Sequence, residues 1–99
     1  MIVSWTGNAK ADLARIHKFV LNSRSGGPTK ANRTINQLFT ESQKLDDALP
    51  VIKGRQLKDF LPREVFRVIV AKDYEMHYEI DFAQNVISIL DVWHTKENR

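Results

Sequence analysis

The chain has 99 residues, 42% of them hydrophobic and 27% charged, and a formal net charge of +3. This length and composition are ordinary for one soluble globular domain with a single core, so we expect one domain over residues 1–99. The chain has no cysteine, which excludes a disulfide framework and a thiolate metal site. The N-terminus lacks the basic and apolar regions of a signal peptide, and no apolar run approaches the roughly 20 residues of a membrane span. We therefore expect a cytoplasmic protein without membrane contact.

The charges are unevenly distributed along the chain. Residues 1–33 carry six Lys or Arg and one Asp, and residues 53–72 carry six Lys or Arg against two acids. Residues 73–92 carry five acids and no Lys or Arg. Such segregation favours a basic face that meets an acidic partner, either nucleic acid or an acidic protein. A solvated, lysine-rich surface is the simpler alternative.

The first part of the chain predicts a strand followed by a helix. Residues 1–6 (MIVSWT) are β-prone, and we expect them to form the edge strand of a sheet or the strand next to it. Thr6 or Asn8 is placed to cap the following helix. Apolar residues then recur at the spacing of an amphipathic helix: Ala9, Leu13, Ile16 and Val20.

A Gly-rich turn at residues 23–28 separates this helix from a second one, which we expect over Pro28–Ala48. Phe39 lies beside the apolar stripe of the second helix, and Ser42 interrupts it. The stripe itself consists of Ala31, Ile35, Leu38, Leu45 and Leu49. Two amphipathic helices joined by a short turn form an αα-hairpin, whose joint apolar face should cover one side of a sheet.

Pro50 ends the second helix, and residues 51–62 then predict a basic loop. Within this loop Leu57, Phe60 and Leu61 form an apolar cluster. The cluster would either tuck under the sheet or form a short strand.

Three strands are predicted from residue 66 to the C-terminal end. FRVIV is followed by YEMHYEID, whose strict alternation is typical of a strand with one buried face and one wet face. VISILDVWH has apolar residues at both its odd and its even positions, which predicts a central strand covered on both faces. The two connections are too short for a crossover helix, so the strands should form an antiparallel meander. The expected class is α+β, in the order βααβββ.

An aromatic–Arg pair opening a strand, then DYxxxYEI, then a VISIL-type strand ending in His, resemble the ParE/RelE superfamily of small bacterial toxins. These are the toxins of type II toxin–antitoxin pairs. The resemblance covers nearly the whole chain, because the N-terminal half also has the expected strand and helical hairpin. It implies the RelE/ParE-like fold and a cognate antitoxin as partner.

Arg67 is the first candidate site residue. It stands inside an otherwise apolar strand, so its charge must reach solvent or an acid such as Glu64, Glu75 or Glu79. In the ribonuclease members of the superfamily, arginines on this sheet bind the scissile phosphate, which a guanidinium can do bidentately. Glu75 departs from their pattern, because RelE-like nucleases have an Arg after the first Tyr of this motif.

The histidines are the other candidates. His94 matches the frequent C-terminal His of the superfamily and could act as a general acid, or it could be a hydrogen-bonded strand-end residue beside Trp93. His77 should lie on the polar face next to Glu75 and Glu79. So few groups do not make a metal site, and we expect neither a metal nor a cofactor.

The favoured function is that of a ParE-like toxin, which would inhibit DNA gyrase by binding and would not be an enzyme. The long hairpin and the missing nuclease Arg favour it. The alternative is a RelE-like endonuclease that cleaves mRNA on the ribosome, with Arg67 and His94 as catalytic residues. A third possibility is an inactive member that retains only antitoxin binding. In each case we expect the basic segment to bind the partner, through Lys53, Arg55, Lys58 and Arg63.

Overall fold

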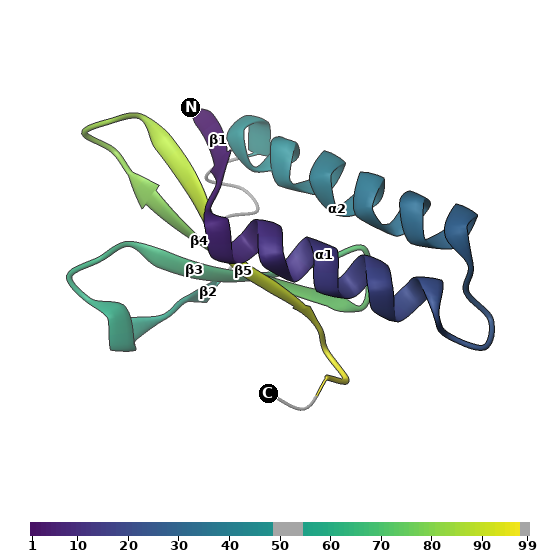
Figure 1. Cartoon of the computed structure of the whole chain (residues 1–99). Coiled ribbons are helices and arrows are strands. Elements are labelled where there is room, and N and C mark those ends of the chain that lie inside the picture. Colours follow the sequence, from purple (N-terminus) through teal and green to yellow (C-terminus); the bar gives the residue numbers. More distant parts are fainter. Residues whose placement is uncertain (49–54, 98–99) are drawn as a thin grey trace.

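The computed structural model describes residues 1–48 and 55–97, so Leu49 and Lys53 lie outside the described residues. Figure 1 shows a sheet with two helices on one side of it. The elements in chain order are β1 (Ile2–Trp5), α1 (Gly7–Leu21), α2 (Pro28–Ala48), β2 (Arg55–Gln56), the 3₁₀ helix η1 (Lys58–Phe60), β3 (Val65–Val70), β4 (Tyr74–Asp81) and β5 (Val86–His94). The predicted α+β order is confirmed, with β2 and η1 added between α2 and β3.

The sheet has the strand order β1-β5-β4-β3-β2. Strands β3, β4 and β5 pair as the predicted antiparallel meander, and β2 extends it on one side. Strand β1 lies at the opposite edge and runs parallel to β5. After β1 the chain therefore forms the helical hairpin first and then adds the remaining four strands of the sheet.

Thr6 fixes the beginning of α1 and ties it to the sheet. Its Oγ1 accepts a hydrogen bond from the Ala9 backbone N–H at 3.2 Å, which makes it the N-cap of the helix. The same hydroxyl donates to the Ile89 carbonyl at 2.8 Å. Of the two capping residues considered, the structure uses Thr6.

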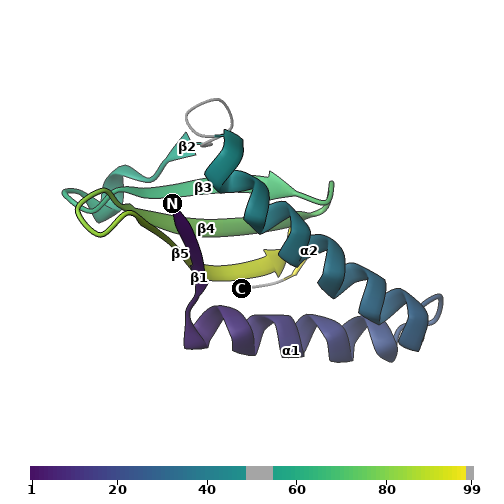
Figure 2. The ribbon, with the colours of Figure 1, turned by 90° about the horizontal axis from the view of Figure 1, so that it is seen from above.

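The two helices lie on one side of the sheet, and Figure 2 shows from above that α2 crosses over it. Their buried residues pack against the strands. The core lies between these layers and consists of Ala9, Ile16, Val20, Ala31, Leu38, Leu45, Phe66, Val70, Tyr74, Met76, Tyr78, Ile80, Ile87, Ile89 and Val92. The side chain of Phe39, which was expected beside the stripe, is 50% exposed. One residue step turns a helix by about 100°, so the neighbour of the buried Leu38 points away from the core.

Ser42 is buried at the centre of the α2 stripe. Its Oγ accepts a hydrogen bond from Trp5 Nε1 at 3.1 Å and donates one to the Phe39 carbonyl at 2.6 Å. The break in the apolar pattern is thus a satisfied polar contact that joins α2 to β1.

The turn between the helices depends on glycine. A Cβ atom at Gly26 would lie 1.7 Å from the Val20 carbonyl oxygen, so no larger residue fits without movement of the backbone. Gly27 has φ +121°, a conformation that side chains disfavour. The hydroxyl of Ser23 also donates to the Val20 carbonyl, at 2.9 Å. The turn is therefore packed closely against the end of α1.

The segment before β3 forms the short strand β2 and then η1. Phe60 and Leu61 are 40% and 54% exposed, so these two residues of the predicted apolar cluster do not tuck under the sheet. The cluster does not form a short strand either, because Phe60 belongs to η1 and the strand β2 consists of Arg55 and Gln56, which precede the cluster and pair with β3.

Strand β5 contains a β-bulge, and this corrects its interpretation as a strand covered on both faces. Tyr78 pairs with Ile89 but His77 pairs with Asp91, so Leu90 is an extra residue. The side chains that face the helices are at odd positions before the bulge and at even positions after it, with Val92 the first. The buried residues Ile87, Ile89 and Val92 therefore serve a single face although they differ in parity, while Trp93 lies on the open face beside His77.

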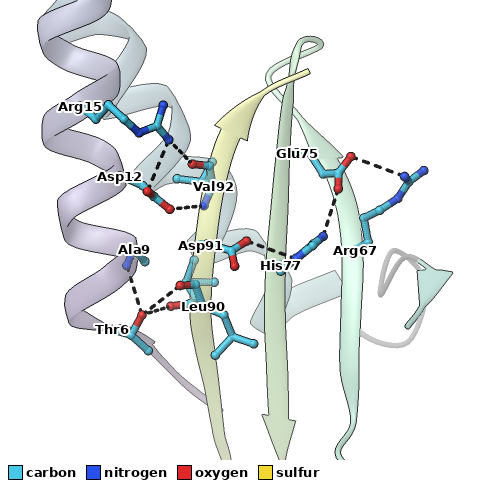
Figure 3. Close-up of polar contacts among 11 residues, drawn as sticks. Thr6, Ala9, Asp12, Arg15, Arg67, Glu75, His77, Leu90, Asp91 and Val92 are labelled. Carbon is cyan, nitrogen blue, oxygen red and sulfur yellow. Dashed lines mark hydrogen bonds and ion pairs between the residues drawn. The ribbon is translucent and has the colours of Figure 1, made fainter. Parts of the chain in front are cut away.

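Beyond the bulge, side chains of α1 take the place of a neighbouring strand. The β1 ladder reaches only Ile89. The Val92 N–H donates to Asp12 Oδ2 at 3.0 Å, and its carbonyl accepts from Arg15 Nη2 at 3.1 Å. Asp12 and Arg15 thus occupy both backbone groups of an otherwise open edge (Figure 3).

Candidate functional site

The candidate site lies on the face of the sheet that the helices leave open. Arg67 on β3 and His77 on β4 are register partners and project from this face. Arg67 Nη1 lies 3.5 Å from Glu75 Oε1, which is one of the ion pairs that the sequence analysis considered (Figure 3). Glu75 Oε2 lies 3.0 Å from His77 Nε2.

His77 is held between two carboxylates. Its Nδ1 lies 3.2 Å from Asp91 Oδ1, while its Nε2 contacts Glu75. The Trp93 ring stands edge-on to the imidazole, with 4.6 Å between the centroids. Each ring nitrogen is therefore engaged by a carboxylate, and neither is directed towards solvent where a substrate would bind.

Asp91 is the member of this cluster that the sequence analysis missed. An unbroken strand alternation would place it on the helix side with Ile87 and Ile89. The bulge at Leu90 turns it to the open face, beside its register partner His77. Both residues are polar, but their meeting depends on the bulge.

His94 lies on the opposite face of the sheet from Arg67. Its register partner is Tyr74, which is buried under the helices, and the two rings contact edge to face at 5.1 Å. Its Nδ1 accepts a hydrogen bond from the Lys96 backbone N–H at 3.1 Å. It also lines a hollow of about 380 Å³ beneath the hairpin, together with Phe19. The structure does not bring Arg67 and His94 together.

The predicted partner-binding cations are placed unequally. Lys58, in η1, is exposed and lines a hollow of about 380 Å³ together with Phe60 and Arg67. Arg55 belongs to β2, where its register partner is Arg67. The Arg63 guanidinium instead makes two hydrogen bonds to Glu79, at 2.9 and 2.7 Å.

The bidentate pair sets the electrostatics at this end of the sheet. The hydrogen bond from Arg63 holds the pKa of Glu79 below its ordinary value, and the charge of the guanidinium acts in the same direction. Arg63 lies over the Phe60 ring, 5.8 Å from the centroid. Its charge is largely compensated by Glu79, whereas Lys58 makes no ion pair among the described residues and lines the hollow beside Phe60.

No cluster of three His, Asp or Glu suited to a metal ion occurs within the described residues. Over the same part of the chain, no helix combines the length and apolar character needed to cross a membrane.

Three comparisons relate the chain to known proteins. A family model described as the ParE toxin of type II toxin–antitoxin systems, parDE, matches residues 3–99. A search of curated proteins found no match. Among solved structures, the chromosomal ParDE toxin–antitoxin system from P. aeruginosa is similar with a TM-score of 0.73 and 20% identity, over 97% of each chain. The RelBE2 toxin–antitoxin complex from Mycobacterium tuberculosis is similar with a TM-score of 0.69 and 20% identity, over 97% of this chain and 92% of that one.

Proposed function

The chain belongs to the ParE toxin family of type II toxin–antitoxin systems, and from this premise we propose that it inhibits DNA gyrase by binding, without catalysis. The observation that carries the proposal is the separation of Arg67 from His94 by the thickness of the sheet. A nuclease needs its phosphate-binding cation and its proton donor on the same substrate. These two residues cannot serve one phosphate.

The charge of the open face supports the same proposal. Strands β4 and β5 contain no Lys or Arg, and the acids on their open face are Glu75, Glu79, Asp81 and Asp91. Arg67, the cation nearest to them on β3, is already paired with Glu75. Such a face repels the phosphates of an mRNA.

Ribosome-dependent mRNA cleavage is the second candidate, and one observation favours it. Arg67, Glu75 and His77 form a contiguous cluster of a cation and two proton-transfer groups. A substrate phosphate that displaced Glu75 from Arg67 would find all three side chains on one face. His77, rather than His94, would then transfer the proton.

For neutralisation by a cognate antitoxin, we propose docking around η1. Phe60 and Leu61 expose apolar side chains next to the hollow that Lys58 and Arg67 line. An acidic segment that folds as it binds would bury the apolar groups and pair with Lys58. The complex should weaken as the salt concentration rises.

The discriminating experiment uses purified protein in two assays. We expect the wild type to inhibit supercoiling by gyrase and to leave mRNA intact on programmed ribosomes. The variants His94→Ala and His77→Gln should inhibit gyrase as the wild type does, because binding transfers no proton. His77→Gln retains a hydrogen-bonding side chain but cannot act as an acid.

Two results would contradict the proposal. Codon-specific cleavage of mRNA by the wild type, lost in His77→Gln, would establish the nuclease candidate instead. Inhibition of neither gyrase nor translation by a folded protein would leave the third possibility, a family member that only binds an antitoxin.

A further inference from the structure

The end of the helical hairpin is a basic surface without acids. No Asp or Glu occurs between Asp12 and Glu41, and this interval contains five Lys or Arg: Arg15, Lys18, Arg24, Lys30 and Arg33. All five are exposed. Arg15 pairs with Asp12 and with Glu97. We call the other four the tip cations.

None of the tip cations makes an ion pair within the described part of the chain. Asp73 lines the same hollow as Lys30, yet the two form no ion pair. Unpaired cations on a surface are compensated only by water and salt, so their charge is available to an anionic partner. The tip carries four such charges within one hairpin.

The tip projects from the molecule. In both ribbon views the turn between α1 and α2 extends beyond the end of the sheet (Figures 1 and 2), and the longest dimension of the protein is 43 Å against 25 and 24 Å. His17 Nε2 contacts Asn32 Oδ1 across the two helices at 2.9 Å. The close packing of Gly26 on α1 also fixes the turn. The tip cations are therefore presented on an ordered protrusion.

We infer that this basic tip binds the phosphate backbone of duplex DNA. This DNA binding goes beyond the proposed binding of gyrase. It rests on the proposed function in one respect only: a toxin bound to gyrase would meet DNA there. The tip cations lie on three elements, since Lys18 belongs to α1, Arg24 to the turn, and Lys30 and Arg33 to α2. Four cations spread over three elements of one protrusion can contact several phosphates of a duplex.

The neighbouring side chains favour DNA over an acidic protein. Exposed polar residues surround the tip cations: Asn22, Ser25, Thr29, Asn32, Asn36 and Gln37. Protein–DNA interfaces are more polar and more positive than interfaces between proteins. Phe19 and Leu21 are exposed near the tip, but Phe19 lines the hollow on the sheet side. Phe39 is exposed on α2, six residues beyond Arg33, and the larger set of exposed apolar side chains lies outside the hairpin, at Ile2, Phe60, Leu61, Ile69 and Phe82.

Binding through phosphates predicts a defined salt dependence. Each neutralised phosphate contributes about −0.9 to the slope of log K against log salt concentration on B-DNA. Three to four contacts then lower the affinity on the order of 100-fold between 50 and 200 mM salt. The affinity should not depend on base sequence, because the tip cations reach the backbone and not the base edges.

The experiment measures fluorescence anisotropy of a labelled 25-base-pair duplex with the full chain between 50 and 200 mM KCl. The test variant removes the tip charges: Lys18→Gln, Arg24→Gln, Lys30→Gln and Arg33→Gln. The matched control removes four exposed charges elsewhere: Lys10→Gln, Lys44→Gln, Lys72→Gln and Lys96→Gln. Circular dichroism checks that both variants are folded. We expect the tip variant to lose about tenfold or more in affinity and most of the salt slope, and the control to stay within about threefold of the wild type.

Three outcomes would overturn the inference. Equal losses in the tip variant and the control would show that only net charge matters. A shallow slope in the wild type would exclude phosphate contacts. Poly-glutamate that binds the tip as tightly as the duplex, and displaces it, would favour an acidic protein partner.

The gyrase assay separates this inference from the proposed function. If the wild type inhibits supercoiling but does not bind the duplex, only the inference about the tip fails. If it binds the duplex and does not inhibit gyrase, only the proposed function fails.

Discussion

The contact of Asp12 with strand β5 makes a quantitative prediction. Its carboxylate accepts the Val92 N–H at 3.0 Å, and its side chain is only 17% exposed. Asp12→Ala removes this charge-assisted hydrogen bond and leaves a part-buried N–H without its acceptor, which costs about 2 kcal/mol. The ion pair with Arg15 adds little, because the Arg side chain is largely in solvent.

Urea unfolding followed by circular dichroism measures this loss. A small domain has a slope of about 1–3 kcal/mol/M, so the midpoint should fall by roughly 1 M while the slope stays unchanged. Asp12→Asn retains an acceptor oxygen and should recover part of the loss. Glu41→Ala is the matched control, because the ion pair that Glu41 makes among the described residues is with the exposed Lys44, and it should cost about 0.5 kcal/mol or less. If Asp12→Ala and Glu41→Ala are equally stable, the carboxylate does not support the edge of β5 and the reasoning fails.

Three further predictions concern the turn and the titrating groups. Gly26→Ala should lower the free energy of unfolding by about 1–3 kcal/mol, measured by thermal unfolding, because its Cβ meets the end of α1. Gly7→Ala is the control and should be close to neutral, because no atom lies near its Cβ. Equal effects of the two substitutions would contradict the packing of the turn. Burial raises the pKa of the Tyr78 phenol above its ordinary value near 10, so its stabilisation is complete below that pH and is lost as the pH rises further. Tyr78→Phe should therefore flatten the decline of unfolding free energy above pH 10, and an unchanged decline would assign it to other groups. Arg63→Ala should raise the pKa of Glu79 in an NMR titration, since that carboxylate loses both hydrogen bonds, and an unchanged titration would show that the pair does not persist in solution.

Local periodicity was sufficient to predict most of the fold. The apolar spacing of α1 and the alternation of β4 both survive in the structure, since Ile16, Val20, Met76 and Tyr78 are buried on the expected faces. These patterns depend on the geometry of one element. Each pattern could therefore be recognised from the residues of its own element, without knowledge of the elements that pack against it.

The candidate site could not be predicted in the same way, because it depends on one inserted residue. Without the bulge at Leu90, His94 would have the parity of Ser88 and would face the open side with Arg67. The bulge places Asp91 there instead and turns His94 under the helices. A bulge has no sequence signature in an apolar run, so the composition of the site is a tertiary property.

The separation of charge between the two layers has a kinetic consequence. Acids occupy the open face of β4 and β5, while the four tip cations project from the hairpin on the other layer, so the charges of these described elements are separated across the molecule. In the field of a polyanion the protein rotates so that its positive end leads. Collisions that begin with the acidic face of β4 and β5 forward are repelled, so a larger share of encounters starts with the hairpin in front. The association rate then falls as added salt shortens the range of that field.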